Sequence, residues 1–228
     1  MADSLFVLGS TGLVGGFIIE TALKSTNWNK ITTLTRRQPQ FANEQNIESI
    51  VNPETSQWPD TIAQIDPPPF AYISSFGTTR DAAGSAENFR KIDYGINLDA
   101  ARAAKENGVQ ICVLVSAFGA SSKSPFLYFK TKAELEEAII ALDFEYTIIL
   151  RPGMLIGQRN GKSDWAHLLA KCTQNPLFSP LFRSVHADDV GKIAVYFASR
   201  AKNGDLREKV KIVDGGELLD LIASEEIE

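Results

Sequence analysis

The sequence predicts an α/β fold, in which helices cover both faces of a doubly wound parallel sheet. Short β-branched or apolar runs alternate with longer runs of helical spacing along the 228 residues. Several short runs are apolar almost throughout, as is typical of strands that are buried on both faces. A glycine-rich turn also follows the first run directly. Together these observations indicate parallel strands joined by helical crossovers.

The strands and helices are expected where the hydrophobic period changes. The expected strands are Leu5–Leu8, Ile31–Leu34, Ile50–Val51, Ala71–Ser74, Ile111–Val115, Thr147–Leu150 and Val210–Val213. The expected helices are Leu13–Leu23, Ala86–Asn107, Lys130–Leu142 and Asp189–Ala198. Asn107-Gly108 is typical of a helix C-terminus, and Asp188-Asp189 of an N-cap. The irregular, aromatic stretch from Gly157 to about Val185 is expected to form a small cap that walls a substrate pocket, although surface packing explains it equally well.

Composition restricts the class of protein. Lys and Arg number 23 against 28 Asp and Glu, and this net charge of -5 argues against a general nucleic-acid binder. Cys112 and Cys172 lie far apart, so neither a zinc site nor a disulfide framework is indicated. No apolar stretch approaches the length of a membrane span, and a first strand from about Ser4 leaves no room for a cleaved targeting peptide. We expect a single domain, with residues 1–156 binding a cofactor and residues 157–228 completing the sheet and the pocket wall.

The first strand is followed by a G-x-x-G-x-x-G turn and then by a helix. Gly9 allows the tight turn, Gly12 allows a pyrophosphate to approach the backbone, and Gly15 allows the helix to pack closely on the strand. The backbone N–H groups of Leu13 and Val14 then point at phosphate from the helix N-terminus. The pattern therefore predicts a Rossmann-like dinucleotide site; the alternative is a simple glycine-rich turn.

The end of the second strand indicates which dinucleotide is bound. An acidic residue usually stands here when the ribose 2′-hydroxyl is free. This chain has Arg36 and Arg37 instead, and a guanidinium can bind a 2′-phosphate through two hydrogen bonds. We therefore expect NADP(H) in preference to NAD(H), unless both arginines are only solvated surface residues.

Three further residues form a candidate reaction site. Ser116 ends the fifth strand, and Tyr128 and Lys132 lie four residues apart on one face of the next helix. Ligands of open α/β sheets bind beyond the carboxyl ends of the strands, so these side chains can meet a cofactor there. Tyr128 would donate or accept a proton, Lys132 would favour its phenolate and hold a ribose, and Ser116 would hydrogen-bond the reacting oxygen. Alternatively, the tyrosine and the lysine are a chance helical pair.

Five further residues are expected to have structural roles. Asp189 is expected to cap a helix rather than to act as an acid. Cys112 is expected to be a buried, small apolar residue. The glutamates after Lys132 are expected to form the solvated face of their helix; they are Glu134, Glu136 and Glu137.

These motifs together resemble the short-chain dehydrogenase/reductase superfamily, in its atypical or extended branch. More closely, the chain resembles the family of the human Tat-interacting protein and its fungal relatives of the mitochondrial outer membrane. The resemblance runs from residue 5 to about 160, and more weakly around Val185–Ala194. The segments that carry it are Leu8–Gly16, Thr35–Arg37, Phe76–Arg80 with Ala83-Gly84, Lys91–Asp93, Val115-Ser116, Phe126–Tyr128, Lys132 and Leu150–Gly153.

The resemblance implies further cofactor contacts. Phe76, Gly77 and Thr78 would line the nicotinamide-side ribose and phosphate, and Pro152 and Gly153 would meet the nicotinamide with Met154 close by. The expected cofactor-binding residues are then Gly9, Ser10, Thr11, Gly12, Leu13, Val14, Arg36, Arg37, Phe76, Gly77, Thr78, Ser116, Tyr128, Lys132, Pro152, Gly153 and Met154. Relatives often carry a second serine where this chain has Ala117, which would weaken binding of the reacting oxygen if that second serine were the productive one.

Two functions fit the sequence. The first is an NADP(H)-dependent oxidoreductase that transfers hydride between nicotinamide and a carbonyl or alcohol substrate, with Tyr128 handling the proton. The second is an NADP(H)-binding regulatory or scaffold protein that contacts a protein partner and has little or no turnover. We expect no nucleic-acid partner, no metal and at most peripheral membrane association. The expected location is cytoplasmic, with a cytosol-facing site on the mitochondrial outer membrane as the alternative.

Overall fold

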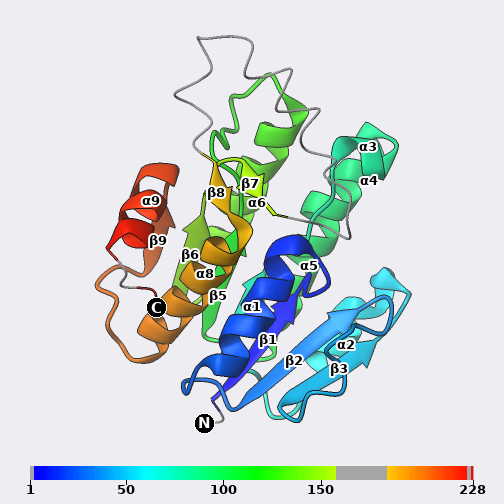
Figure 1. Cartoon of the computed structure of the whole chain (residues 1–228). Coiled ribbons are helices and arrows are strands. Elements are labelled where there is room, and N and C mark those ends of the chain that lie inside the picture. The colour runs from blue at the N-terminus through cyan, green and yellow to red at the C-terminus, as the bar shows by residue number, and fades with distance from the viewer. Residues whose placement is uncertain (1–2, 158–183, 225–226, 228) are drawn as a thin grey trace.

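The computed structural model describes residues 3–157, 184–224 and 227, and shows a twisted sheet between two layers of helices (Figure 1). Seven strands pair in parallel in the order β3-β2-β1-β4-β5-β6-β9. They are β1 (Ser4–Leu8), β2 (Lys30–Thr35), β3 (Ile47–Val51), β4 (Ala71–Ser74), β5 (Ile111–Val115), β6 (Tyr146–Leu150) and β9 (Val210–Val213). The predicted doubly wound parallel sheet is therefore confirmed.

Alternate residues of the strands face the two helical layers. Leu5 and Val7 of β1 belong to a core shared with α1 (Leu13–Lys24), α8 (Ala187–Lys202) and α9 (Gly215–Ala223). Phe6 and Leu8 belong to a second core beneath α2 (Trp58–Ala63), α5 (Asn97–Glu106) and α6 (Leu127–Ala141). Burial of both faces explains why the central strands β1 and β5 are almost entirely apolar. The shorter elements are η1 (Thr55–Gln57), α3 (Arg80–Ala83), α4 (Ala86–Arg90), the π-helical η2 (Lys91–Ile96), and the paired strands β7 (Leu155–Ile156) and β8 (Val185–His186).

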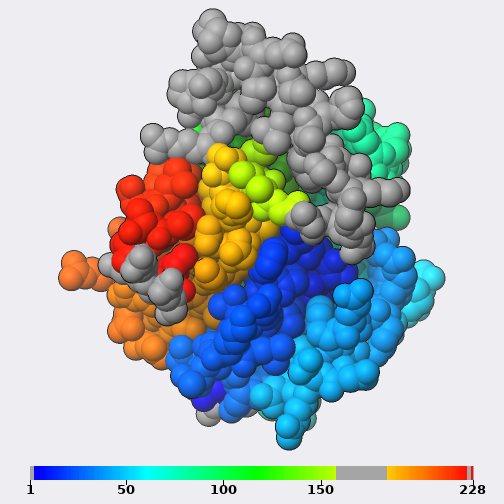
Figure 2. All heavy atoms as spheres, viewed as in Figure 1, coloured from blue at the N-terminus to red at the C-terminus, as the bar shows by residue number. Residues whose placement is uncertain are grey.

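The first helical layer is closely packed. Figure 2 shows α1 and α8 lying side by side over one face of the molecule. A Cβ atom on Gly191 of α8 would lie 2.7 Å from the Cβ of Phe17, so the two helices approach each other at a distance that only glycine allows. This packing fixes α1, whose N-terminus follows the glycine turn.

Three details differ from the sequence-based expectation. The helix expected over Ala86–Asn107 is divided by η2, whose wider turn changes the faces on which later residues lie. His186 is the N-cap of α8, and the expected caps Asp188 and Asp189 lie in the first turn, where their charges favour the helix N-terminus. The helices α2, α3 and α9 and the short strands β7 and β8 were not expected. The predicted C-terminus at Asn107 is confirmed, because Asn107 is the C-cap of α5 and Gly108 has a φ of 102°.

The topology identifies the edge of the sheet at which a ligand would bind. The strand order reverses between β1 and β4, and ligands of open α/β sheets bind in the crevice that such a reversal leaves beyond the carboxyl ends of the strands. The glycine turn follows β1 at this edge, and residues 75–78 follow β4. Most of the expected cap, residues 158–183, lies outside the described residues.

Candidate functional site

The glycine turn has the geometry that its spacing predicts. Gly9 has a φ of 86°, and its carbonyl accepts a hydrogen bond of 2.8 Å from the N–H of Gly12. A Cβ on Gly9 would lie 2.6 Å from the backbone nitrogen of Phe76, and one on Gly15 would lie 2.0 Å from the Gly9 oxygen. Both positions therefore require glycine. The absence of a side chain lets α1 pack against the turn, and lets the turn pack against the loop after β4.

The turn also has features that fit a bound phosphate. The Ser10 side chain is fully buried, and its Oγ has no hydrogen-bond partner among the described residues. A Cβ on Gly12 would meet only the Gly9 oxygen, at 3.1 Å, so the backbone at Gly12 is otherwise accessible. Leu13 and Val14 form the start of α1, where backbone N–H groups have no acceptor within the helix. A dinucleotide pyrophosphate would fit this arrangement of donors. Thr11, the remaining turn residue, is exposed.

Both arginines lie beyond the end of β2. Leu34 pairs with Leu8 of β1, so the chain after β2 leaves the sheet next to the glycine turn. Arg36 and Arg37 are exposed, and neither forms an ion pair with a described residue. The backbone carbonyl of Arg37 accepts a hydrogen bond of 2.8 Å from Thr35. Their guanidinium groups are thus not neutralised by a described carboxylate.

Lys132 is buried and paired with a carboxylate. Its Nζ lies 2.9 Å from Oδ1 of Asp93, and the exposed fractions of the two side chains are 7% and 0%. Oδ2 of Asp93 accepts a hydrogen bond of 2.8 Å from the backbone N–H of Thr78. Burial lowers the pKa of Lys132, but the attraction of Asp93, with help from Tyr128 and Glu136, more than offsets it, so the pKa is raised above its ordinary value. Lys132 is therefore a fixed cation in contact with the loop after β4.

Tyr128 lies one helical turn before Lys132. It is 38% exposed, and its hydroxyl makes no hydrogen bond with a described residue. Its ring packs against Phe89 and Phe129, at centroid distances of 5.9 and 5.3 Å. Lys132 Nζ lies 6.0 Å from the ring centroid. The structure thus brings the predicted tyrosine and lysine together and leaves the phenol accessible.

Ser116 lies in a different contact group. Its hydroxyl donates a short hydrogen bond to Oε1 of Glu136, and both Glu136 oxygens accept from Arg151, with Nε at 3.1 Å from each. Glu136 is only 2% exposed, so the expectation that it is solvated is wrong; Glu134 is half-buried, and Glu137 alone of the three glutamates is exposed. Because the hydrogen of Ser116 is donated to a carboxylate, Ser116 can offer a substrate only an acceptor lone pair.

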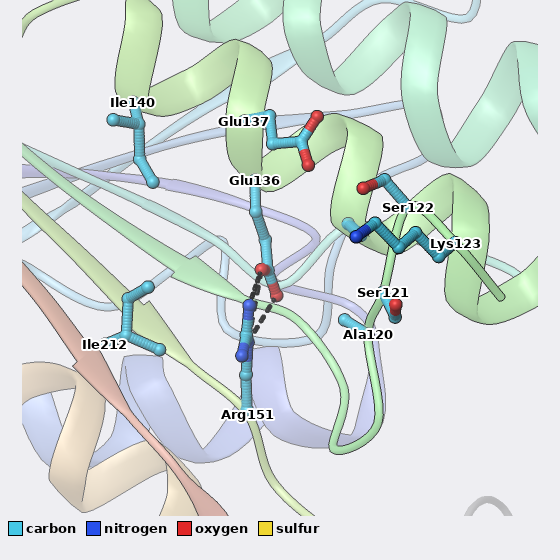
Figure 3. A pocket seen from close by; sticks show the side chains of 10 residues that line it. Ala120, Ser121, Ser122, Lys123, Glu136, Glu137, Ile140, Arg151 and Ile212 are labelled. Atoms are coloured by element: carbon cyan, nitrogen blue, oxygen red, sulfur yellow. Dashed lines mark hydrogen bonds and ion pairs between the residues drawn. The ribbon is translucent and has the colours of Figure 1, made fainter.

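A cavity of about 390 Å³ lies beside this second group (Figure 3). Glu136 and Arg151 meet at its centre, and Lys123, Glu137 and Ile212 contribute to its walls. Tyr128 and the glycine turn do not line it. This cavity therefore lies apart from the glycine turn and Tyr128, beside the carboxyl ends of β5 and β6.

The loop after β6 completes the predicted set. The carbonyl of Pro152 accepts a hydrogen bond of 2.8 Å from the N–H of Phe118, and the carbonyl of Met154 accepts one of 2.9 Å from Val185. Pro152 is buried, and Gly153 and Met154 are half-buried. Backbone contacts thus hold this loop beside the end of β5. Ala117, where relatives carry a second serine, is 8% exposed and presents only a methyl group.

Sequence reasoning missed the roles of Asp93, Glu136 and Arg151. Tyr128, Lys132 and Glu136 are spaced by four residues, so helical spacing alone places all three on one face of α6. That spacing could have identified Glu136 as buried. Asp93 had no comparable signal, because its partner lies on another helix 39 positions away in the sequence.

The chain has relatives among known fungal proteins. The family model HIM1 matches residues 18–182. The mitochondrial protein FMP52 of Lodderomyces elongisporus is 52% identical over 97% of this chain and 98% of its own length, and FMP52 of Candida albicans is 47% identical over 97% and 99%.

Solved structures resemble the fold at low sequence identity. MoeE5 in complex with UDP-glucose and NAD has a TM-score of 0.66 at 13% identity, covering 98% of this chain and 82% of MoeE5. A short chain dehydrogenase family protein from Francisella tularensis has a TM-score of 0.67 at 12% identity, covering 96% and 100%. These likenesses establish a Rossmann-like fold. Within the described part of the chain, no helix is long and apolar enough to cross a membrane.

Proposed function

The chain belongs to the HIM1 family, together with the fungal FMP52 proteins, and on this premise we propose that it is an NADP(H)-dependent oxidoreductase acting on a carbonyl or alcohol. One observation carries the proposal: a phosphate-fitting glycine turn and an accessible tyrosine beside a buried lysine lie at the same edge of the sheet. A structural protein would need neither feature.

The proposed work of the residues follows from their positions. Ser10, Gly12 and the first turn of α1 would bind the pyrophosphate, and Arg36 and Arg37 would bind a 2′-phosphate. When bound, the dinucleotide would supply or accept a hydride. Tyr128 would give its hydroxyl proton to the carbonyl oxygen during reduction and take it back during oxidation.

The remaining predicted contacts would position the ligands. Lys132 would hold the nicotinamide-side ribose and, as a cation, favour the phenolate of Tyr128. Phe76, Gly77 and Thr78 would line the ribose and phosphate, and the loop from Pro152 to Met154 would border the nicotinamide. Ser116, whose hydrogen is already donated, would accept a hydrogen bond from a substrate hydroxyl.

A second function is favoured by one specific feature. The hydrogen of Ser116 is donated to Glu136 and residue 117 is alanine, so neither position offers a hydroxyl hydrogen to a carbonyl oxygen. This favours an NADP(H)-binding regulatory or scaffold protein with a protein partner. The sequence resemblance to the family of the human Tat-interacting protein supports the same alternative. The names of the FMP52 relatives favour a mitochondrial location over the cytoplasmic one.

The test is a cofactor titration followed by a turnover screen. NADPH and NADH are titrated against the protein by calorimetry, and carbonyl substrates are then screened with the native protein and Tyr128→Phe. The oxidoreductase proposal expects tighter binding of NADPH than of NADH, and turnover that falls at least about 100-fold in Tyr128→Phe. Binding without turnover on a broad panel would favour the scaffold, and absence of NADPH binding would reject both functions.

A further inference from the structure

Asp93 is a buried carboxylate to which the proposed chemistry gives no role. Its side chain is fully buried on the π-helical segment Lys91–Ile96. One carboxylate oxygen pairs with Lys132 of α6 and the other accepts from the backbone of Thr78, which follows β4. A single carboxylate therefore joins two elements that both border the cofactor edge.

Neighbouring residues fix the backbone of Asp93 and of the loop after β4. Asn97 donates from Nδ2 to the carbonyls of Phe76, at 2.9 Å, and Asp93, at 3.3 Å, and its Oδ1 accepts from Ser74 at 2.6 Å. A Cβ on Gly77 would lie 2.9 Å from Oδ1 of Asp93 and 3.3 Å from Nζ of Lys132. Gly77 thus lets the loop close over the ion pair, so that the loop and the pair share one arrangement.

Stability alone is a weak reason for such a pair. A buried ion pair loses much of its solvation, and well-packed apolar residues of similar size are often as stabilising. Placement of the pair beneath an exposed glycine, one helical turn from Tyr128, favours a role in the site. The raised pKa of Lys132 supports the same view, because Lys132 stays charged where a ligand would meet it.

We propose that Asp93 is a positioning residue for the part of the site that binds the nicotinamide half of the dinucleotide. Asp93 would hold Lys132 and the Gly77–Thr78 backbone in the arrangement that this binding requires. The inference rests on the proposed function. In this inference the glycine turn and Arg36 bind the adenine half of the dinucleotide, and they do so independently of Asp93.

The experiment compares two ligands on matched variants. Wild type, Asp93→Asn and the control Asp99→Asn are titrated by calorimetry with NADPH and with adenosine 2′,5′-bisphosphate, which lacks the nicotinamide half. Asp99 is exposed on α5 and pairs only with Arg102 among the described residues, which makes it a matched acidic control. We expect Asp93→Asn to raise the Kd of NADPH at least tenfold, with the bisphosphate within twofold of wild type and Asp99→Asn unchanged for both.

The outcomes separate this inference from the proposed function. Wild type that binds neither ligand overturns both. If wild type binds NADPH, two results overturn the positioning role alone. In the first, Asp93→Asn binds NADPH with the same Kd as wild type. In the second, Asp93→Asn weakens binding of NADPH and of the bisphosphate equally.

A double variant keeps the test decisive if Asp93→Asn does not fold. Asp93→Asn combined with Lys132→Met removes both charges, so neither is left buried and unpaired. Because Asp93 also holds the Thr78 backbone, the double variant should bind NADPH at least as weakly as Lys132→Met alone does, and should keep its affinity for the bisphosphate. A double variant that binds NADPH more tightly than Lys132→Met, or that loses affinity for both ligands equally, would overturn the inference.

Discussion

Ser116 donates its hydroxyl hydrogen to the buried carboxylate of Glu136, which also binds the guanidinium of Arg151. The contact joins the end of β5 to the middle of α6 and to the residue that follows β6. Because Glu136 is 2% exposed, its carboxylate is desolvated, and loss of this carboxylate would leave Ser116 and Arg151 without their partner.

Glu136→Gln should therefore destabilise the fold. The change removes the charge that neutralises Arg151 and a strong acceptor for Ser116, and we expect a loss of about 2–4 kcal/mol in the free energy of unfolding. Glu137→Gln is the matched control, since Glu137 is exposed, and should change stability by no more than about 0.5 kcal/mol. Urea unfolding measures both, and equal effects would contradict the buried network.

Gly15→Ala should damage the glycine turn. The added Cβ would lie 2.0 Å from the Gly9 oxygen, so the turn or α1 must shift, at a cost of about 1–3 kcal/mol. At Gly16 a Cβ meets nothing within 4 Å, and Gly16→Ala should stabilise α1 by about 0.5–1 kcal/mol. Thermal unfolding of the two variants should therefore shift in opposite directions; a shared direction would show that the clash is relieved elsewhere.

Arg36→Ala should reduce the preference for a 2′-phosphate. A charge-assisted hydrogen bond contributes about 1–3 kcal/mol, and an exposed side chain lies toward the lower end, so the Kd of NADPH should rise about tenfold. The Kd of NADH should stay within twofold, because NADH lacks the phosphate. Arg102→Ala, an exposed arginine on α5, controls for general loss of positive charge. Equal weakening of NADPH and NADH would rule out the assignment of Arg36.

Cys112 should be chemically inert in the native protein. Burial raises the pKa of its thiol, so the thiolate that reacts with disulfide reagents is scarce at pH 8. In a Cys172→Ser background, the native protein should release no thionitrobenzoate from the disulfide reagent dithiobis(nitrobenzoate) within minutes. After denaturation in guanidinium chloride, the protein should release one equivalent. Rapid reaction of the native protein would mean that β5 opens readily.

Much of the fold follows from local patterns that the sequence carries openly. The run from Ala71 to Ser74 and that from Ile111 to Val115 are strands with the predicted bounds, because continuous apolar runs suit strands buried on both faces. The short helix from Trp58 to Ala63 has too few turns for a periodic signal, and the π-helical turn at Asp93 interrupts a helix whose apolar spacing had suggested continuity.

The sequence by itself determined the order of the strands along the chain, the glycine turn and the pairing of Tyr128 with Lys132, since each depends on residues a few positions apart. Only the tertiary structure decided that Lys132 is paired with Asp93, that Ser116 is bound to Glu136, and that Glu136 is buried. The physical reason is that burial and partner choice depend on which distant segments pack together. The segment η2 packs against α6, which brings Asp93 next to Lys132, and α6 packs beside the end of β6, which brings Glu136 next to Arg151.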